Sequence, residues 1–262
     1  MFDEFTTNLL IFISGLGSGL FVSIASGTAG AIMLPSITVI AGYTIYQAIG
    51  TSLAIDFSIG VVASIIFFKK GNINFDRIFI LIVLGSIFSF IGSHYTSIAR
   101  ESSLNLIIGI FLLLLGLNFI KNGIQKNIEM FDSRLDFTFF RERKMLTFVI
   151  LGVLLGLGSG LIGMGTAGFV AVVLVLVYRY DVVTGIGTAL FSSIFIAGSG
   201  AFGHSMNNEF VMNPFLIAVF GAVLGAACGS FFANEVNEEK LGRIIGVIVT
   251  IFGVVFLFKA FI

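Results

Sequence analysis

Long apolar stretches separated by short polar loops run through most of the 262 residues. A membrane-crossing helix needs about 20 residues, and each half of the chain holds three stretches of that length. They cover residues 46–68, 77–97, 103–120, 183–204, 212–233 and 241–260. The stretch that opens each half, 8–41 or 146–178, is too long for one span and short for two, and glycines interrupt it at 27–30 and 163–168. Each of these two stretches predicts a glycine-broken helical hairpin.

The sequence also repeats itself. The run Gly27-Thr28-Ala29-Gly30 returns 138 positions later as Gly165-Thr166-Ala167-Gly168, and Gly50-Thr51 returns 137 positions later as Gly187-Thr188. A nearly constant offset that continues over roughly 90 residues indicates an internal duplication.

We expect residues 1–121 to form a first transmembrane repeat, 122–144 a cytoplasmic polar linker and 145–262 a second transmembrane repeat. Cytoplasmic loops are enriched in Lys and Arg. If each broken hairpin returns to the side on which it starts, 12 of the 14 basic residues lie on the side of the linker. If each broken stretch crosses the membrane once instead, 10 basic residues lie on that side. The hairpin arrangement gives each half an odd number of crossings, so it predicts two inverted repeats with both termini outside.

The predicted fold is therefore an all-α polytopic membrane protein, in which each inverted repeat is a glycine-broken helical hairpin plus three transmembrane helices. Composition agrees: 57% of the residues are apolar and 11% are charged, against about 25% charged in soluble domains. This composition excludes a soluble domain and a disordered chain. A net charge of zero argues against a nucleic-acid partner, which leaves the lipid bilayer as the expected surroundings.

Few other features bear on compartment or cofactors. The first basic residue is Lys69, and a cleavable signal peptide needs a basic n-region, so we expect the first apolar stretch to be retained. The expected location is a prokaryotic inner membrane. The single cysteine, Cys228, excludes a disulfide framework and a cysteine-ligated metal. We expect no cofactor and no metal, and the sequence leaves formation of a homo-oligomer open.

The glycine breaks are the candidate substrate site. The N-terminus of each second half-helix offers free N–H groups and the positive end of the helix dipole, which together bind an anion without a cation. Nearby hydroxyls could cap these ends or donate to a ligand oxygen. The alternative is that the glycines only allow close helix packing. The candidate substrate-binding residues are Ser26, Gly27, Thr28, Ala29, Gly30, Thr51, Ser52, Gly165, Thr166, Ala167, Gly168, Thr188 and Ser192.

Asp56 is the candidate for proton coupling. It lies in the middle of an apolar span, and an ionisable residue inside a membrane is costly and indicates function by default. A carboxylate that takes up a proton beside a bound anion would couple the movement of the two. Its counterpart in the second repeat is Ser193. The alternative is a structural aspartate bonded to neighbouring hydroxyls.

The run Ser26-Gly27-Thr28-Ala29-Gly30-Ala31-Ile32-Met33-Leu34-Pro35, followed by Ala48-Ile49-Gly50-Thr51-Ser52-Leu53, resembles the signatures of the TauE/SafE family of sulfite exporters. The resemblance covers essentially the whole chain. It implies a membrane transporter for sulfur-containing anions, such as sulfite, thiosulfate or an organosulfonate like sulfoacetate, often with ion coupling.

We therefore expect a secondary transporter that works by alternating access, and no enzyme activity. A passive anion channel is the alternative. An intramembrane hydrolase would need Ser199 or Ser205 beside His204, but neighbours at i and i+1 on a helix point apart. His94 and His204 lie near span ends, where histidines can serve as gates or pH sensors.

Overall fold

The structure, a computed structural model, describes residues 3–76, 78–122, 140, 142–163, 165–233, 246–247, 250–251, 253–258 and 260. Regular structure in these residues is entirely helical. The first half contains α1 (Glu4–Ala25), α2 (Gly30–Pro35), the π-helix η1 (Ser36–Ile40), α3 (Ile45–Lys69), α4 (Ile78–Thr96) and α5 (Glu101–Asn122). The second half contains α8 (Lys144–Ile162), α9 (Ala167–Leu176), α10 (Val182–Met206) and α11 (Met212–Phe232).

Six of these helices, α1, α3, α4, α8, α10 and α11, are long and apolar enough to cross a membrane. This confirms the prediction of an all-α polytopic membrane protein. The span predicted at 103–120 lies within α5. Most of the span predicted at 241–260 and most of the linker predicted at 122–144 lie outside the described residues.

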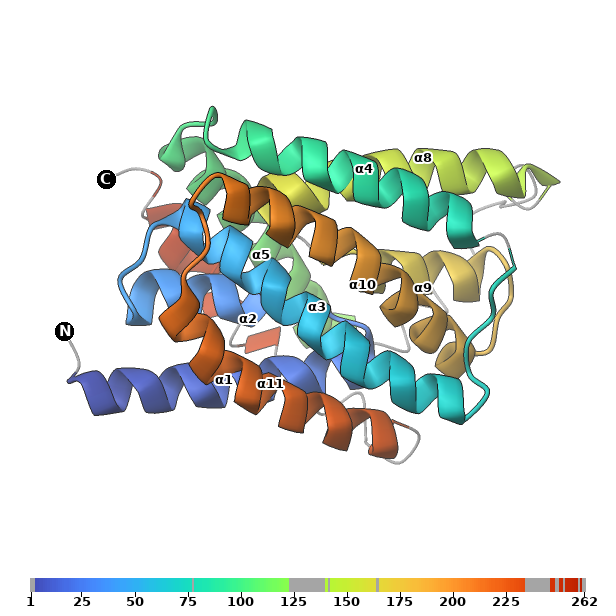
Figure 1. Cartoon of the computed structure of the whole chain (residues 1–262), viewed down its shortest axis with the longest axis horizontal. Helices are drawn as coiled ribbons and strands as arrows, with labels where there is room; N and C mark the ends of the chain where they lie inside the picture. Colours follow the sequence, from blue (N-terminus) through green and yellow to red (C-terminus); the bar gives the residue numbers. More distant parts are fainter. Residues whose placement is uncertain are drawn as a thin grey trace.

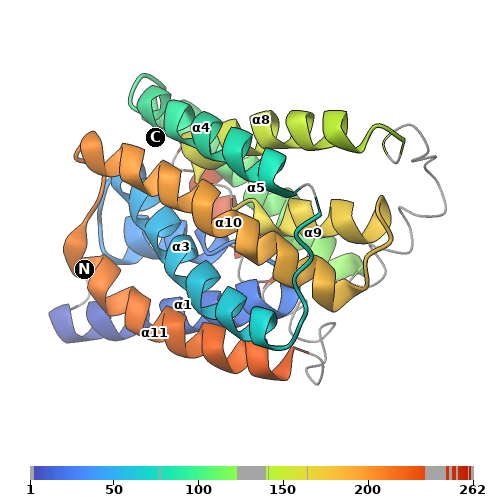
Figure 2. The same cartoon turned by 45° about the vertical axis from the view of Figure 1, so that its right-hand side comes forward.

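Each half begins with a helix that breaks and turns back. The residue after α1, Ser26, has a φ of 50°, and the residue after α8, Gly163, has a φ of 67°. Both angles are left-handed, a conformation that commonly ends helices. In Figures 1 and 2, α2 and η1 run back toward the end of the bundle at which α1 begins. In the same views, α9 runs back toward the end at which α8 begins.

Stripes of small residues hold the outer helix pairs together. A Cβ on Gly19 of α1 would lie 2.6 Å from the backbone nitrogen of Ala226 in α11, and a Cβ on Gly156 of α8 would lie 2.5 Å from the carbonyl oxygen of Gly85 in α4. Backbones this close are typical of small-residue packing between membrane helices. Replacing either glycine would push the two helices apart.

The two central helices, α3 and α10, lie side by side and run in opposite directions (Figure 1). Their starts are capped alike: Thr44 accepts a hydrogen bond from the N–H of Gln47, and Asp181 accepts one from the N–H of Thr184. Gln47 completes a capping box with Thr44, which explains why this polar residue stands at the entrance of a span.

Contacts between the two halves occur in matching pairs. The hydroxyl of Thr51 accepts a hydrogen bond of 3.0 Å from the N–H of Val211, and the hydroxyl of Thr188 accepts one of 2.9 Å from the N–H of Asn74. Thr188 follows Thr51 by 137 positions, and Val211 follows Asn74 by the same number. Each half therefore supplies a threonine hydroxyl that accepts a hydrogen bond from a loop of the other half.

Polar residues just beyond α3 and α10 form a second such pair. Lys70 Nζ donates to the carbonyl oxygen of Ser230 near the end of α11, at 3.2 Å. Asn207, 137 positions after Lys70, donates through Nδ2 to the carbonyl oxygen of Ser93 near the end of α4, also at 3.2 Å. Each side chain thus supplies a donor to a carbonyl in the last turn of a helix, where partners within the helix run out.

Candidate functional site

The two glycine breaks meet inside the bundle. The backbone N–H of Gly165, in the second break, donates to Thr28 Oγ1 of the first break at 2.8 Å. A Cβ on Gly30 would lie 2.5 Å from the carbonyl oxygen of Gly163, and one on Gly168 would lie 2.6 Å from the carbonyl oxygen of Ser26. We call this meeting point, formed by residues 26–30, 163 and 165–168, the junction.

Asp56, on α3, points its carboxylate into the junction. Its Oδ1 accepts a 2.8 Å hydrogen bond from the N–H of Ala29, and its Oδ2 accepts a 3.3 Å hydrogen bond from Thr28 Oγ1. The residue is 5% exposed. Within the described residues, these partners belong to the first break and no Lys or Arg pairs with Asp56.

Thr28 connects the carboxylate to both breaks. Its Oγ1 accepts from the N–H of Gly30 at 3.1 Å and from the N–H of Gly165 at 2.8 Å, while its own hydrogen points to Asp56. A threonine hydroxyl has one donor and two acceptor positions, so Thr28 is fully used. In the first break, the N–H groups of Ala29 and Gly30 are therefore already occupied by Asp56 and Thr28.

The second break keeps unused capacity. In the described structure, no side chain caps the start of α9, and the Thr166 hydroxyl is buried without a hydrogen-bond partner. The same is true of the hydroxyl of Ser26, which belongs to the first break but lies against Gly168 of α9. Each of these two residues is 2% exposed. Buried polar atoms normally have partners, and a helix N-terminus favours negative charge. This side of the junction can therefore donate to an anion.

The remaining members of the two breaks pack around the junction. Ala29 and Ala167 are buried. A Cβ on Gly27 would overlap the ring of Phe21, so the aromatic ring fixes this part of the first break. A Cβ on Gly165 would lie 2.5 Å from Thr28 Oγ1 and 2.9 Å from Asp56 Oδ2, so this position accommodates only glycine.

The other candidate hydroxyls bond elsewhere. Ser52 and Ser192 donate to carbonyls of their own helices, at 2.9 and 2.7 Å, as serines in helices often do. Ser52 still borders the junction, since its Oγ lies 3.3 Å from where a Cβ on Gly163 would be. Thr51 and Thr188 hold the loops that follow α10 and α3, which favours a structural role for both.

Replacing Thr188 with valine is expected to lower stability and to leave the junction intact. The change removes the acceptor of the Asn74 N–H, and a hydrogen bond of this kind contributes about 0.5–1.5 kcal/mol. Thr188→Ser keeps the acceptor and serves as the control. Thermal unfolding in detergent measures the difference. If Thr188→Val weakened anion binding at unchanged stability, Thr188 would belong to the binding site.

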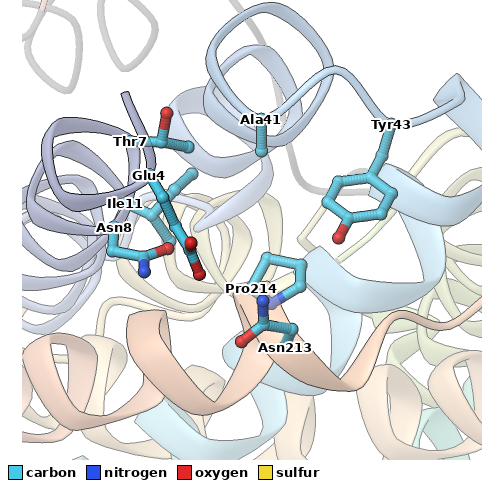
Figure 3. Close-up of a pocket in the computed structure, with 8 residues that line it drawn as sticks. All are labelled: Glu4, Thr7, Asn8, Ile11, Ala41, Tyr43, Asn213 and Pro214. Atoms are coloured by element: carbon cyan, nitrogen blue, oxygen red, sulfur yellow. The ribbon is translucent and has the colours of Figure 1, made fainter. Parts of the chain in front are cut away.

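A separate surface pocket lies at the end of the bundle where α1 begins. Its lining includes Glu4, Thr7, Asn8, Tyr43 and Asn213, and Figure 3 shows the Glu4 carboxylate among these side chains. None of the candidate substrate-binding residues lines it. A carboxylate at its wall disfavours an anion, so this pocket adds nothing to the junction.

His204, a candidate gate or pH sensor in the sequence, has a partner that the sequence did not predict. His204 Nδ1 lies 2.6 Å from Glu209 Oε2, and His204 Nε2 lies 2.8 Å from the carbonyl oxygen of Gly160. Both ring nitrogens are occupied, so the structure gives no support to a hydrolase in which His204 activates Ser199 or Ser205. In the sequence, this contact is indicated by an acidic residue five positions after a histidine at the end of a span. The same pattern is equally typical of a solvent-exposed loop.

Comparison with known proteins agrees with the membrane fold. Residues 11–256 match the family described as "Sulfite exporter TauE/SafE". A "Probable membrane transporter protein YdhB" of Bacillus subtilis (strain 168) is 28% identical over 257 residues, covering 95% of this chain and 98% of the relative. A "Probable membrane transporter protein" of Xylella fastidiosa (strain Temecula1 / ATCC 700964) is 24% identical over 252 residues, covering 89% and 90%.

A third relative, "Probable membrane transporter protein YunE" of Bacillus subtilis (strain 168), is 19% identical over 260 residues, covering 94% of this chain and 95% of the relative. No solved structure matches. The match to the family covers nearly the whole chain and includes most of α1 and all of the other five membrane-length helices. This integral membrane protein therefore belongs to the TauE/SafE sulfite exporter family.

Proposed function

We propose that this chain is a secondary transporter that carries a small sulfur-containing anion through the junction by alternating access. Sulfite, thiosulfate and organosulfonates such as sulfoacetate are the substrate class. The observation that carries this proposal is the meeting of the two breaks around Asp56, beside the unpartnered hydroxyls of Ser26 and Thr166. Broken helices whose ends meet in the bundle are a recurring plan of transporter binding sites.

The anion binds on the side of the second break. The start of α9 supplies backbone N–H groups and the positive end of its dipole, and Ser26 and Thr166 supply hydroxyl donors. These are neutral donors, and no Lys or Arg lies in residues 26–30 or 163–168. An anion held in this way has no ion pair to break, which suits a substrate that must be released on the other side.

The Asp56 carboxylate couples binding to a proton. Two like charges about 4 Å apart repel by roughly 4 kcal/mol at an effective dielectric constant of about 20. An ionised Asp56 beside Gly165 therefore opposes a bound anion. Protonation removes that charge and adds an O–H donor. Anion and proton then bind together and move in the same direction.

The two halves are inverted repeats, and alternating access exchanges their conformations. This is supported by the paired contacts at an offset of 137, such as Thr51 with Val211 and Thr188 with Asn74, and by the opposite directions of α3 and α10 (Figure 1). Because matching contacts link the two halves, small differences in structure between the halves decide which end of the transport pathway is open.

The linker side faces the cytoplasm and both termini lie outside. Several charged residues meet at that end of the bundle. Lys144, at the start of α8, pairs with Asp76 of the α3–α4 loop and lies 5.1 Å from the ring of Tyr178. Lys70 lies in the same loop as Asp76. Basic residues on one side of the membrane indicate the cytoplasmic face.

Flux into proteoliposomes under an imposed pH gradient tests this function. Sulfite, thiosulfate, sulfoacetate and taurine are offered in turn, with chloride and sulfate as controls, while the internal pH is recorded. The expected result is saturable accumulation of one sulfur-containing anion, accompanied by proton movement. Downhill flux that neither saturates nor builds a gradient would identify a passive channel. No flux of any sulfur-containing anion through folded protein would contradict the proposal.

A further inference from the structure

The pair of His204 and Glu209 is the only buried histidine–carboxylate contact in the described part of the chain. His204 stands in the last turn of α10 and is 0% exposed, while Glu209, in the loop before α11, is 7% exposed. The proposed function makes no use of either residue. A buried ionisable pair at the end of a membrane span needs an explanation of its own.

The hydrogen-bond geometry shows that this pair holds a proton. The carbonyl oxygen of Gly160 can only accept, so His204 Nε2, 2.8 Å away, must carry a hydrogen. At 2.6 Å, His204 Nδ1 and Glu209 Oε2 also require a hydrogen between them. The pair is therefore either imidazolium with carboxylate or imidazole with carboxylic acid. Both forms contain one proton more than a neutral histidine beside a free carboxylate.

We propose that His204 and Glu209 form a second proton-binding site, distinct from Asp56, whose proton locks the end of α8 against α10. Gly160 lies three residues before Gly163, where the second break begins. Its carbonyl oxygen also accepts from Thr96 Oγ1 of α4, at 3.1 Å. The last turn of α8 is thus held from two helices immediately beside the junction.

Loss of the proton breaks this lock. With the proton released to water, His204 has one hydrogen for two acceptors, the Gly160 carbonyl and the Glu209 carboxylate. In one of the two contacts, a lone pair of the histidine nitrogen must then face a lone pair of the acceptor oxygen. Losing a buried hydrogen bond in this way costs free energy. The end of α8, and with it the second break, becomes free to move.

Few other charged groups surround the pair. From α3, Tyr46 lies within electrostatic range of both Glu209 and Glu101 at the start of α5, and its hydroxyl donates to the carbonyl oxygen of Ala99. From α4, His94 is exposed and bonds to the carbonyl oxygen of Phe90.

The lock exists at one end of the bundle. The positions 137 residues earlier hold Phe67 and Asn72, and the backbone there has the same turn: the N–H of Asn72 donates to the carbonyl of Phe67 at 2.9 Å, as the N–H of Glu209 donates to that of His204 at 2.8 Å. Neither Phe nor Asn takes up a proton. If the proposed transport function holds, pH on the side of the α10–α11 loop therefore controls opening toward that side alone.

Hydrogen–deuterium exchange of the full chain in lipid nanodiscs tests the lock without any ligand. Exchange at residues 160–168 is compared with exchange at 23–30, which corrects for the effect of pH on intrinsic exchange. In the wild type this ratio is expected to rise at least tenfold from mildly acidic to alkaline pH, because unlocking exposes the second break. Glu209→Gln keeps a donor to His204 without a titrating proton, so its ratio is expected to stay low and flat.

His94→Phe, which removes the exposed histidine of the neighbouring helix, is the matched control and should keep the wild-type response. A flat ratio in the wild type, or a response that survives in Glu209→Gln, would overturn the proposal. The double variant His204→Phe with Glu209→Asn copies the opposite end and should also be flat. A pH response without anion flux in proteoliposomes would contradict the proposed transport function and leave the lock standing.

Discussion

Asp56→Asn is expected to reduce pH-driven accumulation of the anion at least ~100-fold while anion exchange at equal concentrations continues. The asparagine cannot take up or release a proton, so the pH gradient no longer drives uptake. The substitution also disturbs the junction, because the Ala29 N–H and the Thr28 hydroxyl donate to different oxygens of the carboxylate. An amide has only one oxygen that can accept. A moderate loss of stability is expected as well.

Gradient-driven uptake and counterflow in the same proteoliposomes separate coupling from binding. Ser193→Ala is the matched control, because Ser193 stands at the equivalent position of α10 and donates only to the carbonyl of Leu190 in its own helix. This variant should accumulate the anion like the wild type. Accumulation by Asp56→Asn at the wild-type level would show that Asp56 is a structural residue.

Gly165→Val is expected to weaken anion binding at least ~100-fold, equivalent to about 2.7 kcal/mol. The first carbon of any side chain at this position would lie 2.5 Å from Thr28 Oγ1 and 2.9 Å from Asp56 Oδ2. Because both atoms belong to the junction, the breaks must separate to accommodate it. The N–H of Gly165 would then lose Thr28 as its acceptor. Binding is measured by calorimetry on purified protein.

Two glycines of α1 distinguish loss of the site from general misfolding. Gly17→Ala places its methyl group where no atom lies within 4 Å and should change neither affinity nor melting temperature. Gly19→Ala disturbs the contact with α11 and should lower the melting temperature through overpacking, at a cost of about 1–3 kcal/mol. Wild-type affinity in folded Gly165→Val would mean that the breaks serve helix packing only.

Most of the fold could be predicted from local patterns. Apolar length identifies the spans, and the runs Gly27–Gly30 and Gly165–Gly168 identify the two breaks because a membrane helix seldom carries such a run without a reason. The caps of α3 and α10 at Thr44 and Asp181 follow the usual N-cap preferences. These features depend on residues that are close together in the sequence, so they can be recognised without the structure.

The candidate site was less predictable because its chemistry depends on contacts between distant segments. Asp56 and Ala29 are 27 positions apart, and nothing local shows that the carboxylate occupies the first break and leaves the second one available. Thr51 and Thr188 looked like site residues because they recur, but repetition also preserves contacts that hold the halves together. A duplicated residue is therefore weak evidence for substrate binding.

The central claim is that the anion and the proton of Asp56 bind together at the junction. Calorimetry of thiosulfate or sulfoacetate binding, in buffers of different ionisation enthalpy, measures the protons taken up for each anion bound. These anions keep a fixed charge near neutral pH, so any uptake belongs to the protein. The account predicts uptake approaching one proton per anion in the wild type and near zero in Asp56→Asn. Tight binding without proton uptake at any pH would contradict it.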